Sequence, residues 1–370
     1  MRLVITGGGT GGHVYPALEV ARLAKEREAS VLYLGSLRGQ EGRLCEKAGI
    51  EFAGLPSLPL KSLRTLSGWR GLAGLLRSRM KARNELGRRR PDAVFSTGGY
   101  AAAPVVSAAQ ALGIPTVLHE QNSLPGRSNL LFARKAHAIG VTFRSSESHF
   151  EGCRVVRTGM PVRRELRAIA SSKRERDLLP LFLVVGGSQG ARAVNEAALG
   201  AAQRMHGRAL HWLHSTGKAH FEAVFSSYEK LALKDCYEVR AYLEGEAMAE
   251  AYMRASLLVG RAGAGTLAEA AAFGLCGILI PYPHAYADHQ RHNAEEFAAM
   301  EAATVLAQSD LSPASLESAI IPWLENPSRR ERAAVALADW DAPNAAQDLF
   351  ELVSLAAGAS EWIQAKSGTS

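Results

Sequence analysis

The sequence predicts an α/β protein of two Rossmann-like domains, each built on a parallel sheet. Apolar runs of strand length stand directly before glycine-rich turns and helical stretches at Arg2–Thr6, Ala93–Ser96 and Leu181–Val185. This order of strand, turn and helix is typical of βαβ units. The chain has 370 residues, more than the roughly 250–300 residues that one core accommodates. We therefore expect two such domains, with ligand sites at the carboxyl ends of the strands.

Composition narrows the class of protein further. Hydrophobic residues make up 47% of the chain, as expected for a globular fold. No apolar run reaches the ~18 residues of a membrane span, and the charged Arg2 before a short strand does not resemble a signal peptide, so we expect a cytoplasmic protein. The cysteines show no Cys-x-x-Cys spacing and are expected to be packing residues. They are Cys45, Cys153, Cys236 and Cys276.

The net charge of +7 is concentrated in one segment. Between Lys61 and Arg90, ten basic residues stand against Glu85 alone, a pattern that suits nucleic acid or an anionic membrane surface. Apolar residues recur there at helical three- and four-residue steps, which favours a helix lying in a membrane interface. The alternative is that the apolar stripe packs into the core and the arginines are merely solvated. The expected membrane residues are Trp69, Leu72, Leu75, Leu76, Arg77, Arg79, Met80 and Arg83.

The first glycine-rich turn, from Gly7 to His13, indicates a phosphate-binding loop. Gly7, Gly9 and Gly12 match the dinucleotide pattern G-x-G-x-x-G. However, Val31–Leu34 is not followed by the acidic residue that holds the ribose in nicotinamide-binding domains, and the turn carries no lysine. The turn is therefore expected to present backbone amides to a phosphate. His13 is a candidate general base because imidazole exchanges protons near neutral pH.

The stretch from Val259 to Asn293 predicts a second anion site. Gly263 and Gly265 follow a short buried strand and open a helix whose first amides have no partner within the helix. Glu269, on the first turn of that helix, could accept both hydroxyls of a ribose. Further on, polar residues suited to sugar hydroxyls are Asp288, His289, Gln290 and Asn293. The alternative is an ordinary strand-helix-strand unit with a glycine cap.

This stretch resembles the donor-nucleotide signature of the GT-B glycosyltransferases. Together with the other glycine turns it closely resembles the family-28 N-acetylglucosaminyltransferases that form lipid II of peptidoglycan, over roughly Arg2 to Leu352. The resemblance implies a GT-B fold, in which two Rossmann-like domains with parallel sheets face each other across a deep cleft. It places an acceptor- and membrane-binding domain at residues 1–162, a UDP-GlcNAc-binding domain at 163–340, a returning helix at about 341–357 and a weakly ordered tail at 358–370.

The resemblance also assigns roles to residues. It implies inverting transfer of GlcNAc from UDP-GlcNAc to the 4-hydroxyl of the MurNAc of lipid I, with no cofactor and no metal site. His13 or Glu120 would be the general base, and Glu120 could instead be a structural hydrogen-bond partner of neighbouring loops. The acceptor pyrophosphate would meet Gly8, Gly9, Gly98, Gly99 and Tyr100. The donor would meet Thr10, Gly11, Gly12, His13, Asn122, Arg163, Ser188, Gln189, Gly190, Leu243, Gly263, Ala264, Gly265, Thr266, Glu269, Gln290 and Asn293.

The implied partners are UDP-GlcNAc, lipid I, the anionic cytoplasmic face of the membrane and other proteins of cell-wall synthesis, but not nucleic acid. Two alternatives stay open. One is another UDP-sugar enzyme on this fold, such as a glycolipid glycosyltransferase or a sugar 2-epimerase. The other is a nucleotide-sugar-binding protein of the membrane surface without turnover.

The chain departs from the family pattern at a few positions. Asparagine is usual where Met160 stands, leucine where Gly265 stands and proline where Cys276 stands, and Arg127 with Ser128 is also unusual. None of these removes a group assigned to the chemistry.

Between and after these motifs the sequence predicts connecting elements. The polar composition of Ala168–Leu179 predicts a linker. Further on, Asp339 and Asp341 form an Asp-x-Asp pair. That pair binds a metal in another glycosyltransferase class, but between two predicted helices a turn is expected instead. Helices are expected at Ala294–Met300, Pro313–Glu325, Ser328–Ala338 and Pro343–Ala356, the last of them packing on the first domain.

Overall fold

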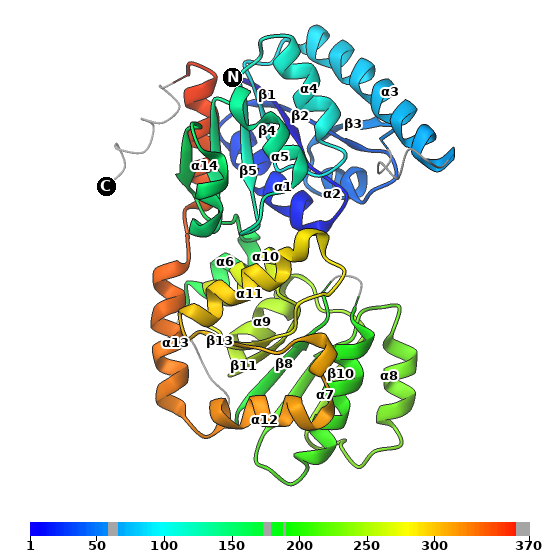
Figure 1. The fold of residues 1–370 in the computed structure, drawn as a ribbon, viewed down its shortest axis with the longest axis vertical. Coiled ribbons are helices and arrows are strands. Elements are labelled where there is room, and N and C mark those ends of the chain that lie inside the picture. The colour runs from blue at the N-terminus through cyan, green and yellow to red at the C-terminus, as the bar shows by residue number, and fades with distance from the viewer. Residues whose placement is uncertain (58–65, 173–178, 188–189, 360–370) are drawn as a thin grey trace. The chain divides into compact units, whose positions relative to one another are not determined.

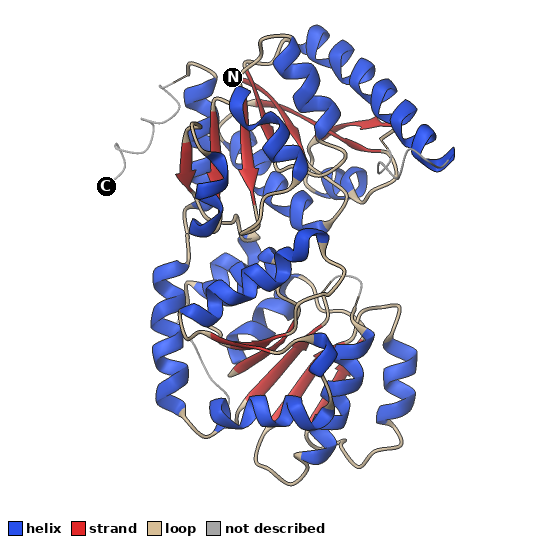
Figure 2. Cartoon of the chain, viewed as in Figure 1, coloured by secondary structure: helices blue, strands red, loops and turns tan. Residues whose placement is uncertain are grey.

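The computed structural model describes residues 1–57, 66–172, 179–187 and 190–359, and the chain divides into two compact units (Figure 1). The first unit comprises Met1–Val162 and the chain from Asn344 onward, and the second comprises Arg163–Pro343. Each unit is built on a parallel sheet flanked by helices (Figure 2), which is the α/β class that the sequence predicts. Within the described ranges, no helix is long and apolar enough to cross a membrane.

The sheet of the first unit has seven strands in the order β3-β2-β1-β4-β5-β6-β7. The chain order changes direction between β1 and β4, which pair in parallel, so the turns after these strands lie side by side at a switch point. The observed bounds of β1, Arg2–Thr6, and of β4, Ala93–Ser96, are those that the sequence predicts. The strands are β1 (Arg2–Thr6), β2 (Ser30–Ser36), β3 (Glu51–Leu55), β4 (Ala93–Ser96), β5 (Thr116–Glu120), β6 (Ala138–Val141) and β7 (Val155–Arg157).

Alternate residues of this sheet face two cores. Leu3 and Ile5 of β1 pack with α1 and α14, whereas Val4 packs with α3 and α4. Leu349 and Phe350 of α14 are completely buried in the first of these cores, so the last described helix is an integral part of the first unit. Its helices are α1 (Gly11–Glu26), α2 (Glu41–Lys47), α3 (Leu66–Arg89), α4 (Ala103–Ala111), α5 (Arg127–Phe132) and α14 (Ala345–Ala356).

The sheet of the second unit has six strands in the order β10-β9-β8-β11-β12-β13, with its switch point between β8 and β11. The strands are β8 (Leu181–Val185), β9 (His211–Ser215), β10 (Tyr237–Arg240), β11 (Leu257–Gly260), β12 (Gly277–Leu279) and β13 (Ala303–Val305). The helices are α6 (Arg164–Ala170), α7 (Arg192–Arg204), α8 (Phe221–Tyr228), α9 (Gly245–Arg254), α10 (Ala264–Ala272), α11 (His289–Ala299), α12 (Pro313–Leu324) and α13 (Pro327–Trp340).

Two predictions of element bounds in this unit are wrong. Residues 168–170, expected in a linker, end helix α6, whose Leu166 is completely buried; residues 173–178 of the expected linker lie outside the described ranges. Helix α11 begins at His289 rather than Ala294, so Gln290 and Asn293 lie on its first turns and not in a loop.

The Asp-x-Asp pair is a helix end rather than a simple turn. Asp339 lies within α13 and Asp341 follows its last residue. The carboxylate of Asp341 accepts two hydrogen bonds from the guanidinium of Arg167 on α6, one of them 2.9 Å long. This ion pair ties two helices of the second unit together and accounts for Asp341.

The cysteines differ in how deeply they are buried. Cys45 and Cys276 are buried, and the half-buried Cys153 packs against the core cluster that contains Phe150, so the prediction of packing residues is confirmed for these three. Cys236 is half-buried. None of the four forms a disulfide bond with another described residue.

The predicted membrane stripe of α3 is exposed at some of its residues and half-buried at others. Small residues face the core, where Ser78 bonds to Ser57 at 3.0 Å and Ala82 is completely buried. Leu72 and Leu75 are half-buried, while Leu76 and Met80 are 54% and 60% exposed. Arg77 and Arg83 are exposed, but Arg79 is half-buried and donates to Ser107 of α4 at 3.0 Å. The side chain of Trp69 lies outside the described part of the chain. Leu76 and Met80 thus form a short exposed apolar row on the outer face, and membrane contact of the whole stripe stays a prediction.

Candidate active site

In the first unit, the turns after β1 and β4 interlock through their backbones. The amide of Gly8 donates to the carbonyl of Gly98 at 3.4 Å. Gly99 has φ +86°, and a Cβ there would lie 2.1 Å from the Gly8 carbonyl oxygen. Only glycine satisfies both the left-handed backbone and this close approach. The two glycine turns that the sequence singled out are thus brought together.

His13 lies on the first turn of α1, between these two turns. Its Nδ1 is 2.8 Å from the carbonyl oxygen of Thr97, and the Thr97 hydroxyl donates back to the His13 carbonyl at 2.7 Å. A carbonyl can only accept, so Nδ1 carries the proton in this bond. The neutral ring therefore keeps its lone pair on Nε2, which is the form that a general base requires.

Three of the amides expected to bind pyrophosphate are engaged within the protein. Besides Gly8, the amide of Gly9 donates to Glu41 Oε1 at 3.2 Å, and the amide of Gly98 donates to Ser96 Oγ at 3.1 Å. Glu41 is completely buried beneath the turn. A lone glutamate at a helix start has no distinctive pattern, so the sequence does not predict this contact. The exposed residues Thr10 and Gly12 at the start of α1 are better placed for an anion.

Glu120 holds a loop together. It is 1% exposed, and its oxygens accept from the amides of Asn122 at 2.9 Å and Gly126 at 3.0 Å and from Asn129 Nδ2 at 2.8 Å. These bonds favour the structural role that the sequence left open and orient Asn122. The neighbouring His119 is also completely buried, and burial lowers the pKa of its imidazole to about 4.

In the second unit, the start of α10 has backbone amides without a side-chain cap. Gly263 precedes the helix without any side-chain cap, and the first bond in the ladder runs from the Leu267 amide to the Gly263 carbonyl at 3.0 Å. The amides of Ala264, Gly265 and Thr266 therefore have no partner in the helix ladder. A diphosphate could accept from these groups, whose dipoles also favour negative charge.

Glu269 lies on the second turn of α10, one turn later than predicted. Arg163, also predicted as a donor residue, donates to Glu269 Oε1 from Nε at 3.1 Å and from Nη2 at 2.9 Å. The hydroxyl of Tyr252 donates to Oε2 at 3.2 Å. The carboxylate is thus oriented by donors at both oxygens.

The remaining donor residues differ in how accessible they are. Gln290 is half-exposed, and its Oε1 accepts from the Tyr282 amide at 3.0 Å. Asn293 is completely buried and donates to the Ala262 carbonyl at 3.2 Å, so it braces the turn before α10 rather than presenting its amide to a sugar. Leu243, in the turn between β10 and α9, is 8% exposed. Gly190 has φ +76° in the turn after β8. Ser188 and Gln189 lie outside the described residues.

Backbone strain marks the segment before α11. Ala287 and Asp288 have φ values of +50° and +54°, which residues other than glycine rarely adopt. Such strain gathers at ligand sites. Arg261, which no sequence pattern indicates, supports the same region: it is 8% exposed and donates to the carbonyls of Ile280 and Pro281 at 3.1 Å each. Burial lowers the pKa of its guanidinium.

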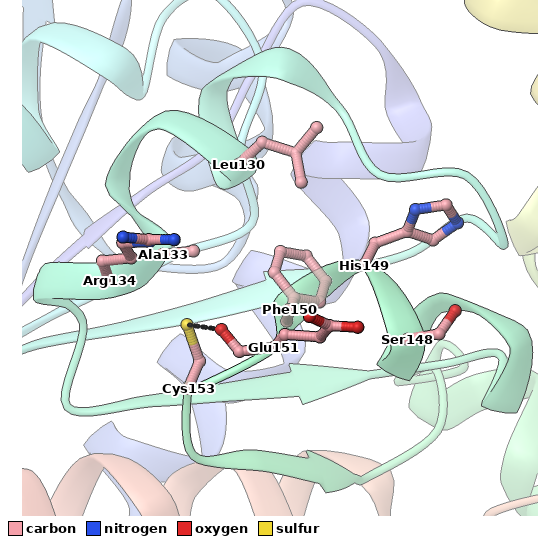
Figure 3. Close-up of a pocket in the computed structure, with 8 residues that line it drawn as sticks. All are labelled: Leu130, Ala133, Arg134, Ser148, His149, Phe150, Glu151 and Cys153. Carbon is pink, nitrogen blue, oxygen red and sulfur yellow. Dashed lines mark hydrogen bonds between the residues drawn. The ribbon is translucent and has the colours of Figure 1, made fainter.

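A hollow of about 320 Å³ lies elsewhere in the first unit, between α5 and the residues before β7 (Figure 3). The thiol of Cys153 faces it and donates to the carbonyl of Glu151 at 3.9 Å. None of the predicted site residues lines this hollow. Its lining residues are Leu130, Ala133, Arg134, Ser148, His149, Phe150, Glu151 and Cys153.

Glycine-rich turns at the switch points of two separate parallel sheets are the arrangement of the GT-B glycosyltransferases, and the fold assigns the chain to this class. The glycosyltransferase family 28 N-terminal domain matches residues 3–141, and the family 28 C-terminal domain matches residues 181–349. The chain belongs to glycosyltransferase family 28.

Similar proteins agree with this assignment. The UDP-N-acetylglucosamine–N-acetylmuramyl-(pentapeptide) pyrophosphoryl-undecaprenol N-acetylglucosamine transferase of Desulfitobacterium hafniense strain Y51 is 40% identical over 361 residues, covering 93% of this chain and 96% of the relative. The crystal structure of Acinetobacter baumannii MurG has a TM-score of 0.77 at 29% identity and covers 96% of this chain and 99% of its own. A putative UDP-N-acetylglucosamine 2-epimerase from Listeria monocytogenes, 13% identical with a TM-score of 0.69 over 95% of both chains, shares the fold alone.

Proposed function

We propose that this glycosyltransferase moves GlcNAc from UDP-GlcNAc to the 4-hydroxyl of the MurNAc of lipid I, with inversion, to form lipid II. The name of the relative that is 40% identical suggests the substrates. One geometric observation carries the chemistry of the donor: unpartnered amides at the start of α10 stand one turn before a carboxylate that Arg163 and Tyr252 orient.

The second unit would hold the donor. Breaking the bond between C1 and the phosphate leaves negative charge on the departing diphosphate, and the fixed amide dipoles of Ala264 to Thr266 would stabilise that charge. Glu269 would accept the ribose hydroxyls. Because Oε1 of Gln290 already accepts from Tyr282, its amide nitrogen is the group that would donate to a sugar hydroxyl. We assign it the 4-hydroxyl of GlcNAc.

The first unit would hold the acceptor. His13 is the proposed general base, since the bond from Nδ1 to Thr97 leaves Nε2 as the proton acceptor. The resemblance assigns Thr10 to Gly12 at the start of α1 to the donor. We propose this helix start for the acceptor diphosphate instead, because the neighbouring amides of Gly8, Gly9 and Gly98 are engaged within the protein. Glu120 is proposed to hold the loop that contains Asn122.

The outer face of α3 is proposed to lie on the anionic cytoplasmic surface of the membrane. Leu76 and Met80 are exposed one turn apart, and Arg77, Lys81 and Arg83 are exposed around them. This is the pattern of an interfacial helix. An acceptor carried on a polyprenyl lipid would make such binding useful. Other proteins of cell-wall synthesis are proposed as further partners.

A transfer assay tests the function. Purified protein is incubated with UDP-GlcNAc and a lipid I analogue, and the products are identified by mass spectrometry. We expect a disaccharide-linked lipid and UDP in equal amounts, and neither without acceptor. A 2-epimerised UDP-sugar formed without acceptor, or transfer only to a diacylglycerol acceptor, would contradict the proposal in favour of another UDP-sugar enzyme.

A further inference from the structure

The carboxylate of Glu269 is held by two residues from different elements of the second unit. Arg163, directly before α6, donates twice to Oε1, and Tyr252 of α9 donates once to Oε2. The side chains of Arg163 and Glu269 are only 15% and 17% exposed. Donors of the protein therefore lie against both oxygens, and their directions fix the plane of the carboxylate.

Tyr252 has a firmly defined position. It is 1% exposed, and its ring stacks on that of Phe273 with centroids 5.3 Å apart and planes 17° apart. Phe273 directly follows α10, the helix that carries Glu269. The hydroxyl of Tyr252 is therefore anchored to the same helix whose carboxylate it contacts.

The hydroxyl of Tyr252 remains a donor across the working pH range. Burial, and next the negative charge of Glu269, raise the pKa of Tyr252 well above its usual value of 10. A protonated phenol facing a carboxylate oxygen can only donate to it. Its bond to Oε2 opposes rotation of the carboxylate about its last side-chain bond, which the two bonds of Arg163 to the other oxygen do not prevent by themselves.

We propose that Tyr252 is a positioning residue that sets the plane of the Glu269 carboxylate so that it accepts both vicinal hydroxyls of a ribose, and that it thereby makes the donor site selective for ribonucleoside over 2′-deoxyribonucleoside diphosphates. The inference rests on the proposed donor role of Glu269. A vicinal diol needs two acceptor positions at a fixed spacing, whereas a single hydroxyl can be met by a carboxylate in many orientations.

Tyr252→Phe tests the proposal, because it keeps the stacked ring and removes only the hydroxyl. The affinities of UDP and 2′-deoxy-UDP are measured by calorimetry on the full chain. We expect the affinity for UDP to fall about 5- to 10-fold, the size of the net contribution of one typical hydrogen bond, because the hydroxyl acts on the ligand only through Glu269. The affinity for 2′-deoxy-UDP should change much less, so the ratio of the two should fall by a similar factor. In the transfer assay, KM for UDP-GlcNAc should rise more than kcat falls.

A second variant separates positioning from packing. If Tyr252 acts through Glu269, its hydroxyl should have no further effect on the UDP to 2′-deoxy-UDP ratio in a Glu269→Gln background. Tyr237→Phe is the matched control, because it removes another buried hydroxyl of the same unit, bonded to His214 at 2.7 Å, and should leave the ratio unchanged. Equal losses for both nucleotides, or an unchanged UDP affinity, would overturn the proposal. Because binding needs no acceptor, a failure of GlcNAc transfer would be seen separately.

Discussion

The molecule has two half-sites: the glycine turns with His13 in the first unit, and the start of α10 with Glu269 in the second. They position their functional groups by different means. In the first unit the backbone does it: the turns at Gly8 and Gly99 approach too closely for any side chain, and His13 is held by a backbone carbonyl. In the second unit side chains do it: Arg163 and Tyr252 orient Glu269, while the amides at the start of α10 have no partner in the helix ladder. A Cβ at Gly263 would meet no atom within 4 Å. The first half-site should therefore be sensitive to glycine replacement and the second to loss of side-chain donors.

The largest expected effect is on catalysis in the first unit. His13→Ala should lower turnover at least about 100-fold, the usual contribution of a general base. The affinity for UDP should stay almost unchanged, because the proposed base acts on the acceptor. Single-turnover kinetics and calorimetry measure the two quantities separately. A large loss of UDP affinity with near-normal turnover would show that His13 contributes to donor binding and is not the general base.

Gly99→Ala should break the interlocked turns. The substitution combines a φ of +86° with a contact of 2.1 Å to the Gly8 carbonyl, so we expect a loss of roughly 2–3 kcal/mol in the free energy of unfolding. Gly113→Ala is the matched control: φ is +71°, but a Cβ there meets nothing within 4 Å, and about 1 kcal/mol should be lost. Denaturant unfolding of both variants decides whether close approach or backbone conformation matters more.

Glu269→Ala gives the corresponding test in the second unit. We expect the affinity for UDP to fall by about 1.5–3 kcal/mol, since two hydrogen bonds from ribose to a charged group are lost. Glu295→Ala removes an exposed glutamate that pairs with Arg291 on α11, and it should leave UDP affinity unchanged. An affinity for UDP equal to that of the wild-type protein would show that Glu269 does not bind the ribose.

Acidification should destabilise both units through buried neutral histidines. Burial lowers the pKa of His119 to about 4 and that of His214 to about 3, from a usual 6.5. Below pH 6.5 each histidine binds a proton in the unfolded chain but stays neutral in the folded chain. The free energy of unfolding therefore falls as the pH drops from about 6.5 towards these values. Each histidine contributes up to about 1.4 kcal/mol per pH unit. Because its pKa is lower, His214 should act over the wider range, and His214→Gln should flatten the pH dependence of the unfolding free energy below pH 6.

The same contrast explains how far the sequence could predict the site. Strand ends and glycine turns follow from local patterns, so β1, β4 and β8 and the glycines of both half-sites were predicted. Tyr252, Glu41 and Arg261 were missed because each acts through a partner far away in the sequence, such as Gly9 for Glu41 or Ile280 for Arg261. The start of α11 was also missed, since the left-handed residues Ala287 and Asp288 that precede it carry no glycine signal.

The smallest expected effect concerns α3, where apolar spacing alone did not separate the outer face from the inner one. The structure makes the test sharper, because Leu76 is 54% exposed whereas Leu75 is half-buried. Leu76→Glu should weaken sedimentation with anionic vesicles without lowering the melting temperature, while Leu75→Glu should also destabilise the fold.

The charges around this row give a second test. Each cation near an anionic leaflet contributes about 1 kcal/mol, so replacing Arg77, Lys81 and Arg83 should weaken vesicle binding as well. Salt should weaken the binding by screening these charges. Replacement of Arg79 should affect binding less, because its guanidinium is bonded to Ser107. Equal binding of the wild-type protein to neutral and anionic vesicles would show that this face does not recognise membrane charge.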